Sequence, residues 1–367
     1  MQKSSADEWS IIEKLLPDGW QHKAVELAAF RRVRYTQSPT QLLRLLLFHA
    51  INDGGLDTTV TQARAAGIAD MSKVALFKRL RTSAPWLRWI ASSLCEQFRG
   101  GPAPKISPAC RLRAIDSTII TGPASTGTDW RLHFSLDLNS MSCDWHRLTT
   151  GRVAESLALV PTRTSDILIA DRGFGHPQAI NKVHGAGAEV LVRARWADPI
   201  HPPGRPKAGP LALVSRLRVG QVGEWSVRFG GGEHATTGRL IAMKLPLPVA
   251  RAKEKKLKQR ASRKQYGIDE RTLKAAHYVM LFTTLKEKTL DAKRVMELYR
   301  HRWQIEIAFK RLKQLLKLGK LPHKDAAAAE SFILAKLVVA LLLEKIHRNA
   351  RCFSPWGFNL EQQTAAA

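Results

Sequence analysis

The chain has 367 residues, which exceeds the usual length of one domain, so we expect two or three domains. Its 58 lysines and arginines outnumber 31 aspartates and glutamates and give a formal net charge of +27. Such a charge predicts a polyanionic partner, with nucleic acid as the first candidate. Hydrophobic residues make up 44% of the chain, which is enough for a core and excludes a disordered polycation.

Neither a leader nor a membrane span is expected. The N-terminus has no apolar signal region, and no stretch of about 18 residues is apolar throughout. The cysteines are scattered without a CxxC pair, which argues against a zinc site and a disulfide framework and predicts a reducing, cytoplasmic location. They are Cys95, Cys110, Cys143 and Cys352.

Residues 1–105 are predicted to form a helical domain. Thr40–Asn52 has the composition of a buried helix, and a helix–turn–helix-like pattern follows. Its first helix is Thr59–Ala66, and its second is Lys73–Arg81 with Ser72 as the N-cap.

Two interpretations of that second helix remain open. We expect Val74, Phe77 and Leu80 to pack inward, which leaves a basic face outside. This face either reads DNA at a specific site or belongs to an ordinary basic amphipathic helix. Its outward residues are Lys73, Lys78, Arg79 and Arg81.

A glycine- and proline-rich linker at residues 100–104 precedes a change to strand-like patterns. Residues 106–195 are predicted to form the first part of a mixed α/β core. The expected strands are Cys110–Ile120, Trp130–Leu138, Ser142–Thr149, Asp166–Ala170 and Glu189–Ala194. The expected helices are Glu155–Val160 and Gln178–His184.

Residues 196–275 interrupt this pattern with several prolines and a Gly230–Gly232 run. We predict a small β-rich insertion. Its expected strands are Leu211–Leu217, Glu224–Phe229 and Gly238–Leu245. The basic tail, Arg251–Lys264, is either a solvated loop or a clamp on the DNA backbone.

Residues 276–325 are predicted to return to the core with a strand at His277–Thr284 and a long helix from Leu290 to about Lys317. Residues 326–367 contain a last helix, Ala326–Arg348. Its apolar face supplies either core packing or a dimer interface. The residues on this face are Phe332, Leu334, Leu337, Val338, Leu341 and Leu342.

One face of the long helix carries an unusual set of polar side chains. At about 100° per residue, four of them fall on one strip about 60° wide. A tyrosine, two cations and one carboxylate suit a surface that grips phosphate and places one acid at a metal ion. They are Tyr299, Arg302, Glu306 and Lys313, while Leu298, Ile305, Phe309 and Leu312 can pack inward on the other side.

The spacing Tyr-x2-Arg-x3-Glu-x6-Lys resembles the signature of the insertion-sequence-4 family of bacterial transposases, within the larger Asp-Asp-Glu (DDE) group. Two upstream segments resemble the other hallmarks of this family. One is an apolar stretch that ends in Asp116 and continues Ser-Thr, and the other ends in Asp171 and continues Arg-Gly-Phe. The three motifs occur in the family's order and span residues 112–313.

This resemblance implies an α/β fold, namely a ribonuclease-H-like mixed-sheet catalytic core interrupted by a β-rich insertion, with helical N-terminal and C-terminal regions. It also implies two Mg²⁺ ions, which Mn²⁺ can replace, and cut-and-paste transposition through a hairpin at each DNA end. In this scheme Asp116 bridges both ions, Asp171 completes one metal's protein ligands and Glu306 the other's. Water attacks first, followed by the freed 3′-OH.

The resemblance further implies that Tyr299, Arg302 and Lys313 hold phosphates beside the scissile bond. Tyr278 lies where some relatives place a tryptophan that receives a flipped base, and it is otherwise a half-buried strand residue. Arg172 either touches DNA or braces Asp171. Expected backbone contacts in the basic tail are Lys255, Lys256, Lys258 and Arg260.

Two neighbouring residues have ordinary structural explanations. Gly173 allows a tight turn after the strand. His176 is expected to start a helix and not to bind a metal.

The expected partners are double-stranded DNA at element ends and targets, and a second copy of the chain in a synaptic homodimer. Two alternatives share parts of this evidence. A non-catalytic DNA-binding protein of transposase descent would use only the basic surface, and a simple metal-dependent nuclease would cut without strand transfer.

Overall fold

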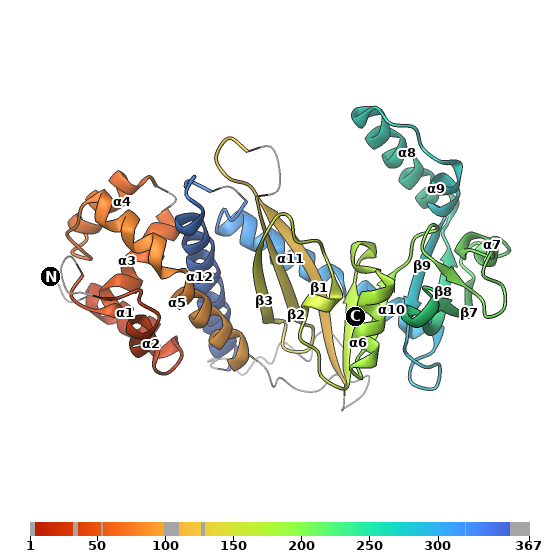
Figure 1. The fold of residues 1–367 in the computed structure, drawn as a ribbon, viewed down its shortest axis with the longest axis horizontal. Coiled ribbons are helices and arrows are strands. Elements are labelled where there is room, and N and C mark those ends of the chain that lie inside the picture. The colour runs from red at the N-terminus through yellow and green to blue at the C-terminus, as the bar shows by residue number, and fades with distance from the viewer. Residues whose placement is uncertain are drawn as a thin grey trace.

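A computed structural model describes residues 4–31, 36–52, 54–98, 110–125, 129–319 and 321–352. The predicted linker at 100–104 lies outside these ranges. The molecule is elongated, with a helical bundle at one end, a sheet through the middle and a protruding helix at the other end (Figure 1).

A nine-stranded mixed sheet forms the centre, with the order β3-β2-β1-β4-β5-β9-β8-β7-β6. β1 pairs antiparallel with β2 and parallel with β4, and β4 pairs parallel with β5. This is the mixed-sheet core expected from the sequence. The five strands on this side are β1 (Arg111–Ile120), β2 (Trp130–Asp137), β3 (Ser142–Thr150), β4 (Asp166–Ala170) and β5 (Glu189–Arg193).

The strands of residues 196–275 continue the same sheet. β9 joins β5 on one side and β8 on the other, both antiparallel, so core and insertion share one hydrogen-bonded ladder. The strands of the insertion are β6 (Ile200–His201), β7 (Val222–Phe229) and β8 (Thr236–Lys244), and β9 (Tyr278–Thr283) is the strand predicted to return to the core. The helices are α6 (Pro177–Gly185), α7 (Pro210–Val214), α8 (Leu247–Lys264) and α9 (Glu270–Ala275).

Two segments, one in the insertion and one before it, have a different structure from the one predicted. The strand predicted at Leu211–Leu217 is wrong, because Pro210 starts the short helix α7 there and suits the first helical turn. The helix predicted at Glu155–Val160 is reduced to a 3₁₀ turn, Leu157–Leu159. Two further 3₁₀ turns are Arg172–Phe174 and Gly232–His234.

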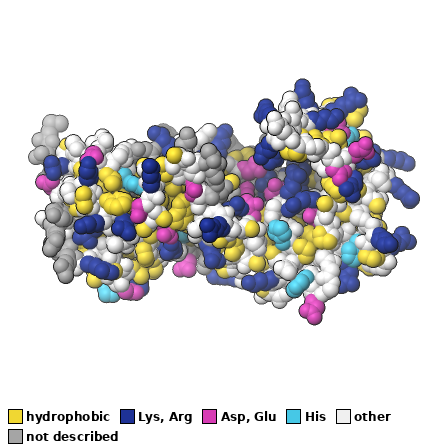
Figure 2. Space-filling view, turned by 45° about the horizontal axis from the view of Figure 1, so that its top comes forward, with side chains coloured by type: hydrophobic (Ala, Val, Ile, Leu, Met, Phe, Trp, Pro, Cys, Tyr) yellow, Lys and Arg dark blue, Asp and Glu magenta, His cyan; other side chains and the backbone are white. Residues whose placement is uncertain are grey.

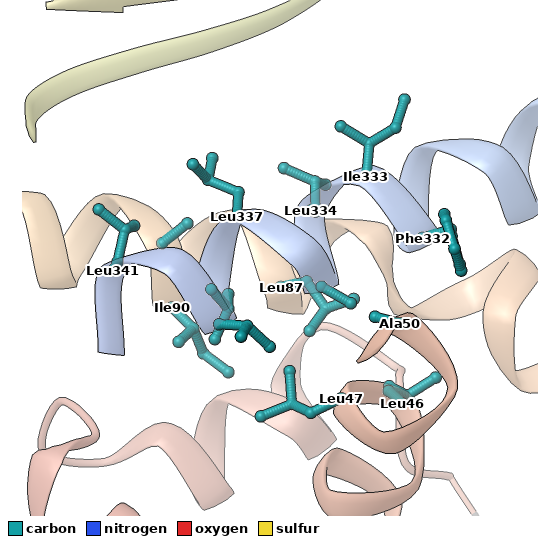
Figure 3. Close-up of a cluster of buried hydrophobic side chains, with 14 of the residues drawn as sticks. Leu46, Leu47, Ala50, Leu87, Ile90, Phe332, Ile333, Leu334, Leu337 and Leu341 are labelled. Atoms are coloured by element: carbon teal, nitrogen blue, oxygen red, sulfur yellow. The ribbon is translucent and has the colours of Figure 1, made fainter. Parts of the chain in front are cut away.

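The helical bundle contains the first and last described elements of the chain. They are α1 (Ser4–Leu15), α2 (Trp20–Glu26), α3 (Pro39–Asn52), α4 (Leu56–Ala65), α5 (Lys73–Gln97) and α12 (Ala326–Cys352). α12 packs against α5 and α3 (Figures 1 and 3). Its predicted apolar face is therefore core, since Phe332, Leu334 and Leu337 are each at most 1% exposed.

By length and composition, Ala326–Asn349 would suffice to cross a membrane. However, 72% of its most apolar window is buried inside this chain, as expected for a central core helix. Figure 3 shows Leu87 and Ile90 of α5 on the side of α12 that meets Leu46, Leu47 and Ala50 of α3, while Leu337 and Leu341 point from α12 to the other side.

α5 begins as predicted and ends much later than predicted. The hydroxyl of Ser72 accepts a hydrogen bond from the backbone N of Ala75 at 3.2 Å, which confirms the N-cap. The helix then continues through Pro85 to Gln97. A proline inside a helix costs about 3 kcal/mol, and burial of the following apolar stripe against α12 offsets that cost.

Two orientations predicted for α5 are wrong. Val74 is 54% exposed, and Leu76 is buried in its place. Arg79 turns toward the segment that follows α2, where it donates to the carbonyl of Ala29 at 3.3 Å and lies over the ring of Phe30. A guanidinium can satisfy a buried carbonyl and cover an aromatic face, so a basic residue need not face solvent.

The long helix predicted from Leu290 is two helices, α10 (Ala292–Arg300) and α11 (Trp303–Leu315). His301 and Arg302 lie between them, and their backbone N–H groups bond three residues back instead of four. The predicted inward face is nevertheless confirmed, because Leu298, Ile305, Phe309 and Leu312 are all buried.

Candidate active site

Asp116 and Asp171 occupy equivalent positions on neighbouring parallel strands. The β1–β4 register runs to the pair Ile115–Ala170, so the next residue on each strand is an aspartate. β4 ends there, whereas β1 continues beside β2 to Ile120. Asp116 therefore lies inside its strand, as the predicted strand Cys110–Ile120 requires, whereas Asp171 follows the end of β4.

The break between α10 and α11 brings the third acid to these two. Arg302 Nη2 donates to Glu306 Oε1 at 2.5 Å, and Arg302 Nη1 lies 3.9 Å from Asp116 Oδ2. Tyr299 Oη donates to Asp171 Oδ1 at 3.4 Å. Two carboxylates thus share one guanidinium, and the third meets the neighbouring phenol.

Lys313 is placed apart from this group. It is exposed and lies seven residues after Glu306 on α11, which is about 10 Å along the helix axis. Of the four residues on the predicted strip, Tyr299, Arg302 and Glu306 meet at the acids, and Lys313 does not.

The pKa of Asp116 is raised, because this carboxyl is buried close to other acids. Burial raises its pKa to about 6, and the charges of Glu155 and Asp171 add to this effect, while Arg302 opposes it. Burial and the nearby Asp171 also raise the pKa of Tyr299 above its usual range, so the phenol remains a donor.

This donor set suits divalent cations that prefer oxygen ligands. Asp116, Asp171 and Glu306 come from two strands and a helix, and nearby cations relieve the repulsion among their carboxylates. Asp116 and Glu306 now pair with the guanidinium of Arg302. Metal binding at these two acids therefore requires this guanidinium to move aside.

A fourth acid, Glu155, was not recognised as a site residue in the sequence. Its Oε1 accepts a hydrogen bond from Ser117 Oγ at 2.6 Å and lies 3.4 Å from Arg131 Nη1. A Cβ at residue 173 would collide with Glu155 Oε2. Gly173 therefore gives room to this carboxylate, and the predicted tight turn is present as the 3₁₀ turn Arg172–Phe174, with no left-handed φ at Gly173.

No local motif could have revealed Glu155, because its partners lie on β1 and β2 and in the turn after β4. The sequence pattern only suggested a helix start at this position. His176, by contrast, is confirmed as a helix start, since it is the N-cap residue of α6.

A cavity of about 800 Å³ opens beside the acids, between α10, the start of α11 and the β7–β9 strands. Its wall combines apolar, aromatic and basic side chains, which is suitable for a nucleotide. Its lining residues include Val222, Met243, Val279, Leu281, Met296, Tyr299, Trp303, Arg193, Lys253, Lys293, Arg300 and Arg302.

Tyr278 does not line this cavity. Val279 and Leu281 do, and side chains alternate along a strand, so Tyr278 projects from the opposite face of β9. Lys244 lies over its ring at 5.9 Å. Trp303 is on the cavity wall instead, with half of its surface exposed.

Basic residues surround the acids on the insertion side. Burial lowers the pKa of Arg172, with a further contribution from Arg193, which indicates that like charges are crowded there. The pKa of Lys253 on α8 is also lowered by burial, and the charges of Arg193 and Arg172 add to this effect. Arg172 also accepts a hydrogen bond at its carbonyl from Arg195 Nη2 at 2.7 Å.

The basic tail of the insertion is helical and is not a loop. α8 spans Leu247–Lys264 and stands out from the sheet (Figure 1). The exposed residues include Lys255, Lys256, Lys258 and Arg260. Figure 2 shows lysine and arginine side chains gathered over this protruding part, beside a hollow in which acidic side chains are visible.

The predicted DNA-reading helix has fewer available cations than expected. Lys78 is exposed, but Lys73 pairs with Asp57 at 3.2 Å and Arg79 donates to the carbonyl of Ala29. The pattern of two helices and a turn is confirmed by α4 and α5, and its role in DNA recognition stays a prediction.

Comparison with known proteins shows which family the chain is related to. A family model described as "Transposase DDE domain" matches residues 109–342. The putative transposase InsL of insertion sequence element IS186A from Escherichia coli (strain K12) is 33% identical over 364 residues, which cover 96% of this chain and 97% of that protein. The transposase for insertion sequence element IS421 from Escherichia coli is 33% identical over 367 residues, with the same coverage.

The family match covers the strands, the insertion and the helices that assemble the acids, and the relatives match along nearly their whole length. The chain therefore belongs to the DDE transposases, the enzymes that move DNA segments such as insertion sequences.

Proposed function

We propose that this transposase acts at the ends of a bacterial insertion sequence by metal-dependent hydrolysis and strand transfer, in the manner of the insertion-sequence-4 family. The observation that carries the proposal is the meeting of Asp116, Asp171 and Glu306 around Arg302 and Tyr299. The strands hold the two aspartates in fixed register, and the helix break directs Glu306 toward them.

Asp116, Asp171 and Glu306 would hold two Mg²⁺ ions, which activate the attacking oxygen and stabilise the leaving oxygen when bound. Glu155 keeps Ser117 and the turn at Gly173 in place, and so positions the first two acids. When DNA enters, Arg302 exchanges its carboxylate partners for a phosphate, for which a guanidinium has a matching pair of donors.

The cavity beside the acids is proposed to hold a displaced base at the DNA end during hairpin formation. Trp303 offers an exposed aromatic face on its wall, and Arg300 and Lys293 offer charge for the adjoining phosphates. Tyr278 lies behind this wall, so we assign the stacking role to Trp303 instead.

The proposed assembly is a homodimer that holds two element ends together. Each chain supplies one set of catalytic acids, whereas an element has two ends to be cut and joined. Cleavage that appears only when two ends are present would support this arrangement.

The direct test is incubation of the full chain with a labelled DNA fragment from the end of its element. We expect cleavage with Mg²⁺ and none with EDTA, and we expect loss of cleavage in Glu306→Gln. If the chain binds tightly but does not cleave even when two ends are present, whichever divalent metal is added, a non-catalytic DNA-binding protein is favoured. Cleavage without joining to target DNA would favour a simple nuclease.

The exposed cations of α8 are expected to hold the DNA backbone near the acids. Replacement of Lys255, Lys256, Lys258 and Arg260 by Gln should weaken binding equally for element-end and unrelated DNA. Each lost phosphate contact should reduce the slope of log K against log salt by about 0.9. Fluorescence anisotropy at several salt concentrations measures this slope.

The matched control for α8 is Lys264→Gln, a single change in the last turn of the same helix. It should leave the salt slope within about one unit of the wild-type value. An unchanged slope in the quadruple variant would exclude α8 from the DNA path.

A further inference from the structure

Three side chains with metal-binding atoms form a cluster separate from the three acids, and His146 of this cluster lies two strands from Asp116 in the sheet. Cys95 comes from the last turn of α5, and Cys143 and His146 come from β3. Cys95 Sγ lies 3.4 Å from Cys143 Sγ and 3.5 Å from His146 Nδ1. The three ligand atoms all lie within 4.8 Å of one another. The fold therefore brings two of the four cysteines together, although their positions in the sequence are far apart.

A β-bulge explains how one strand supplies two of these ligands. Residues three apart on a regular strand project from opposite faces. Between Ser135 and Leu136 of β2, the register on β3 advances by two residues, so Asp144 is inserted as an extra residue. The bulge brings Cys143 and His146 to the face that meets α5, and it turns Asp144 to the opposite face.

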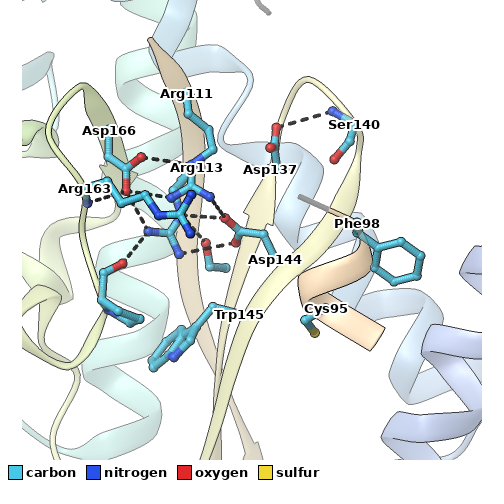
Figure 4. Close-up of polar contacts among 12 residues, drawn as sticks. Cys95, Phe98, Arg111, Arg113, Asp137, Ser140, Asp144, Trp145, Arg163 and Asp166 are labelled. Carbon is cyan, nitrogen blue, oxygen red and sulfur yellow. Dashed lines mark hydrogen bonds and ion pairs between the residues drawn. The ribbon is translucent and has the colours of Figure 1, made fainter. Parts of the chain in front are cut away.

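All three side chains of the cluster are buried. Cys95, Cys143 and His146 are 2%, 0% and 8% exposed, respectively. Figure 4 shows Cys95 at the end of α5, beside the strand that carries Asp144 and Trp145. A carboxylate from α12 is also present, because Glu344 Oε1 accepts a hydrogen bond from the backbone N of Cys143 at 3.2 Å.

The two distances from Cys95 Sγ, 3.4 and 3.5 Å, are close to those expected for coordination to one tetrahedral ion. Zinc–sulfur bonds of about 2.3 Å and zinc–nitrogen bonds of about 2.0 Å place two sulfurs roughly 3.8 Å apart and a sulfur and nitrogen roughly 3.5 Å apart. A disulfide would require about 2.05 Å between the sulfurs. Two thiols and an imidazole form a soft donor set, which selects zinc over magnesium.

We propose that Cys95, Cys143 and His146 bind one Zn²⁺ ion, with the Glu344 carboxylate available for the fourth position. The ion fastens the end of α5 in the helical bundle to β3 at the edge of the catalytic sheet. Its role is structural, because the site is buried and holds no substrate path of its own.

The test measures zinc in the purified full chain by mass spectrometry after growth in zinc-containing medium. We expect one zinc ion per chain, and its loss in Cys95→Ser and in Cys143→Ser. The matched control is Cys110→Ser, which removes a thiol outside the cluster and should retain the zinc. Asp116→Asn should also retain it, which separates this site from the proposed magnesium site.

A second measurement does not depend on the folding of the variants. After chelation of the zinc, addition of Co²⁺ to the wild-type chain should produce a thiolate-to-cobalt charge-transfer band in the near ultraviolet, and Zn²⁺ should abolish it. A folded chain that lacks both zinc and this band would overturn the proposal. A Cys95–Cys143 disulfide in the zinc-free native protein would overturn it too.

Discussion

Asp116→Asn is expected to abolish DNA cleavage and, without metal, to make the protein more stable at pH 7.5. Loss of a metal ligand removes several kcal/mol of transition-state stabilisation, so the cleavage rate should fall at least about 1,000-fold. The folded chain should survive the change, since Asn Oδ1 can still accept the bond from the backbone N of Ser117, now 2.8 Å long.

The gain in stability follows from the raised pKa of Asp116. Its folded-state pKa of about 6 exceeds the value of 3.8 for an ordinary Asp, so the folded protein binds this proton more tightly than the unfolded chain. The resulting destabilisation is absent below pH 4, grows as the pH rises to 6 and is complete above that. Two pKa units correspond to at most about 3 kcal/mol.

Thermal unfolding at pH 4 and pH 7.5, with and without Mg²⁺, measures these effects. The difference between Asp116→Asn and wild type should appear at pH 7.5 without metal and vanish at pH 4. Mg²⁺ should stabilise the wild type and leave the variant unchanged. Asp137→Asn is the control for metal binding, since burial also raises the pKa of that acid, but it lies at the end of β2 opposite Arg113 and away from Asp116, so Mg²⁺ should still stabilise this variant. An Asp116→Asn protein that cleaves at the wild-type rate would refute the assignment.

Arg113→Met is expected to cause the largest loss of stability among single polar substitutions. Arg113 is 1% exposed and lies 2.7 Å from Asp144 Oδ2 and 3.1 Å from Asp166 Oδ2 (Figure 4). It also donates to the carbonyl of Pro161 at 2.7 Å. Without it, the two buried carboxylates lose one of the two guanidinium groups that they share, so the free energy of unfolding should fall by about 3–5 kcal/mol.

Urea-induced unfolding followed by circular dichroism checks this value. The control is Arg64→Met, whose partner Asp70 and own side chain are both mostly exposed, so it should change stability by less than about 1 kcal/mol. A loss in Arg113→Met no larger than in this control would show that Arg111 alone satisfies both acids.

The sequence pointed to the three acids that the structure brings together, because each depends on a local pattern. An apolar strand followed by an acid identified Asp116 and Asp171, and helical spacing placed Glu306 beside Arg302 and Tyr299. Lys313 shares the strip but lies about 10 Å farther along the helix axis, so its contact with phosphate stays a prediction.

The remaining features depend on contacts between distant segments, which spacing does not encode. Glu155 reaches the site only after β1, β2 and β4 assemble, and Cys95 meets Cys143 only when α5 packs on a bulged strand. Arg79 was assigned to the surface from its charge, although its hydrogen-bond partner is a carbonyl fifty residues earlier. For each of these residues, tertiary packing determines the environment.

The pairing of α5 with α12 has a consequence for biosynthesis. Roughly 230 residues separate the end of α5 from the start of α12, so a ribosome adding about 5–20 residues per second delivers the partner helix some 10–45 seconds later. Throughout that interval the apolar stripe of the nascent α5 lacks the surface that covers it in the native protein. The bundle therefore reaches its native packing only after translation has passed the catalytic segments, and a prematurely terminated chain presents that stripe to chaperones and proteases.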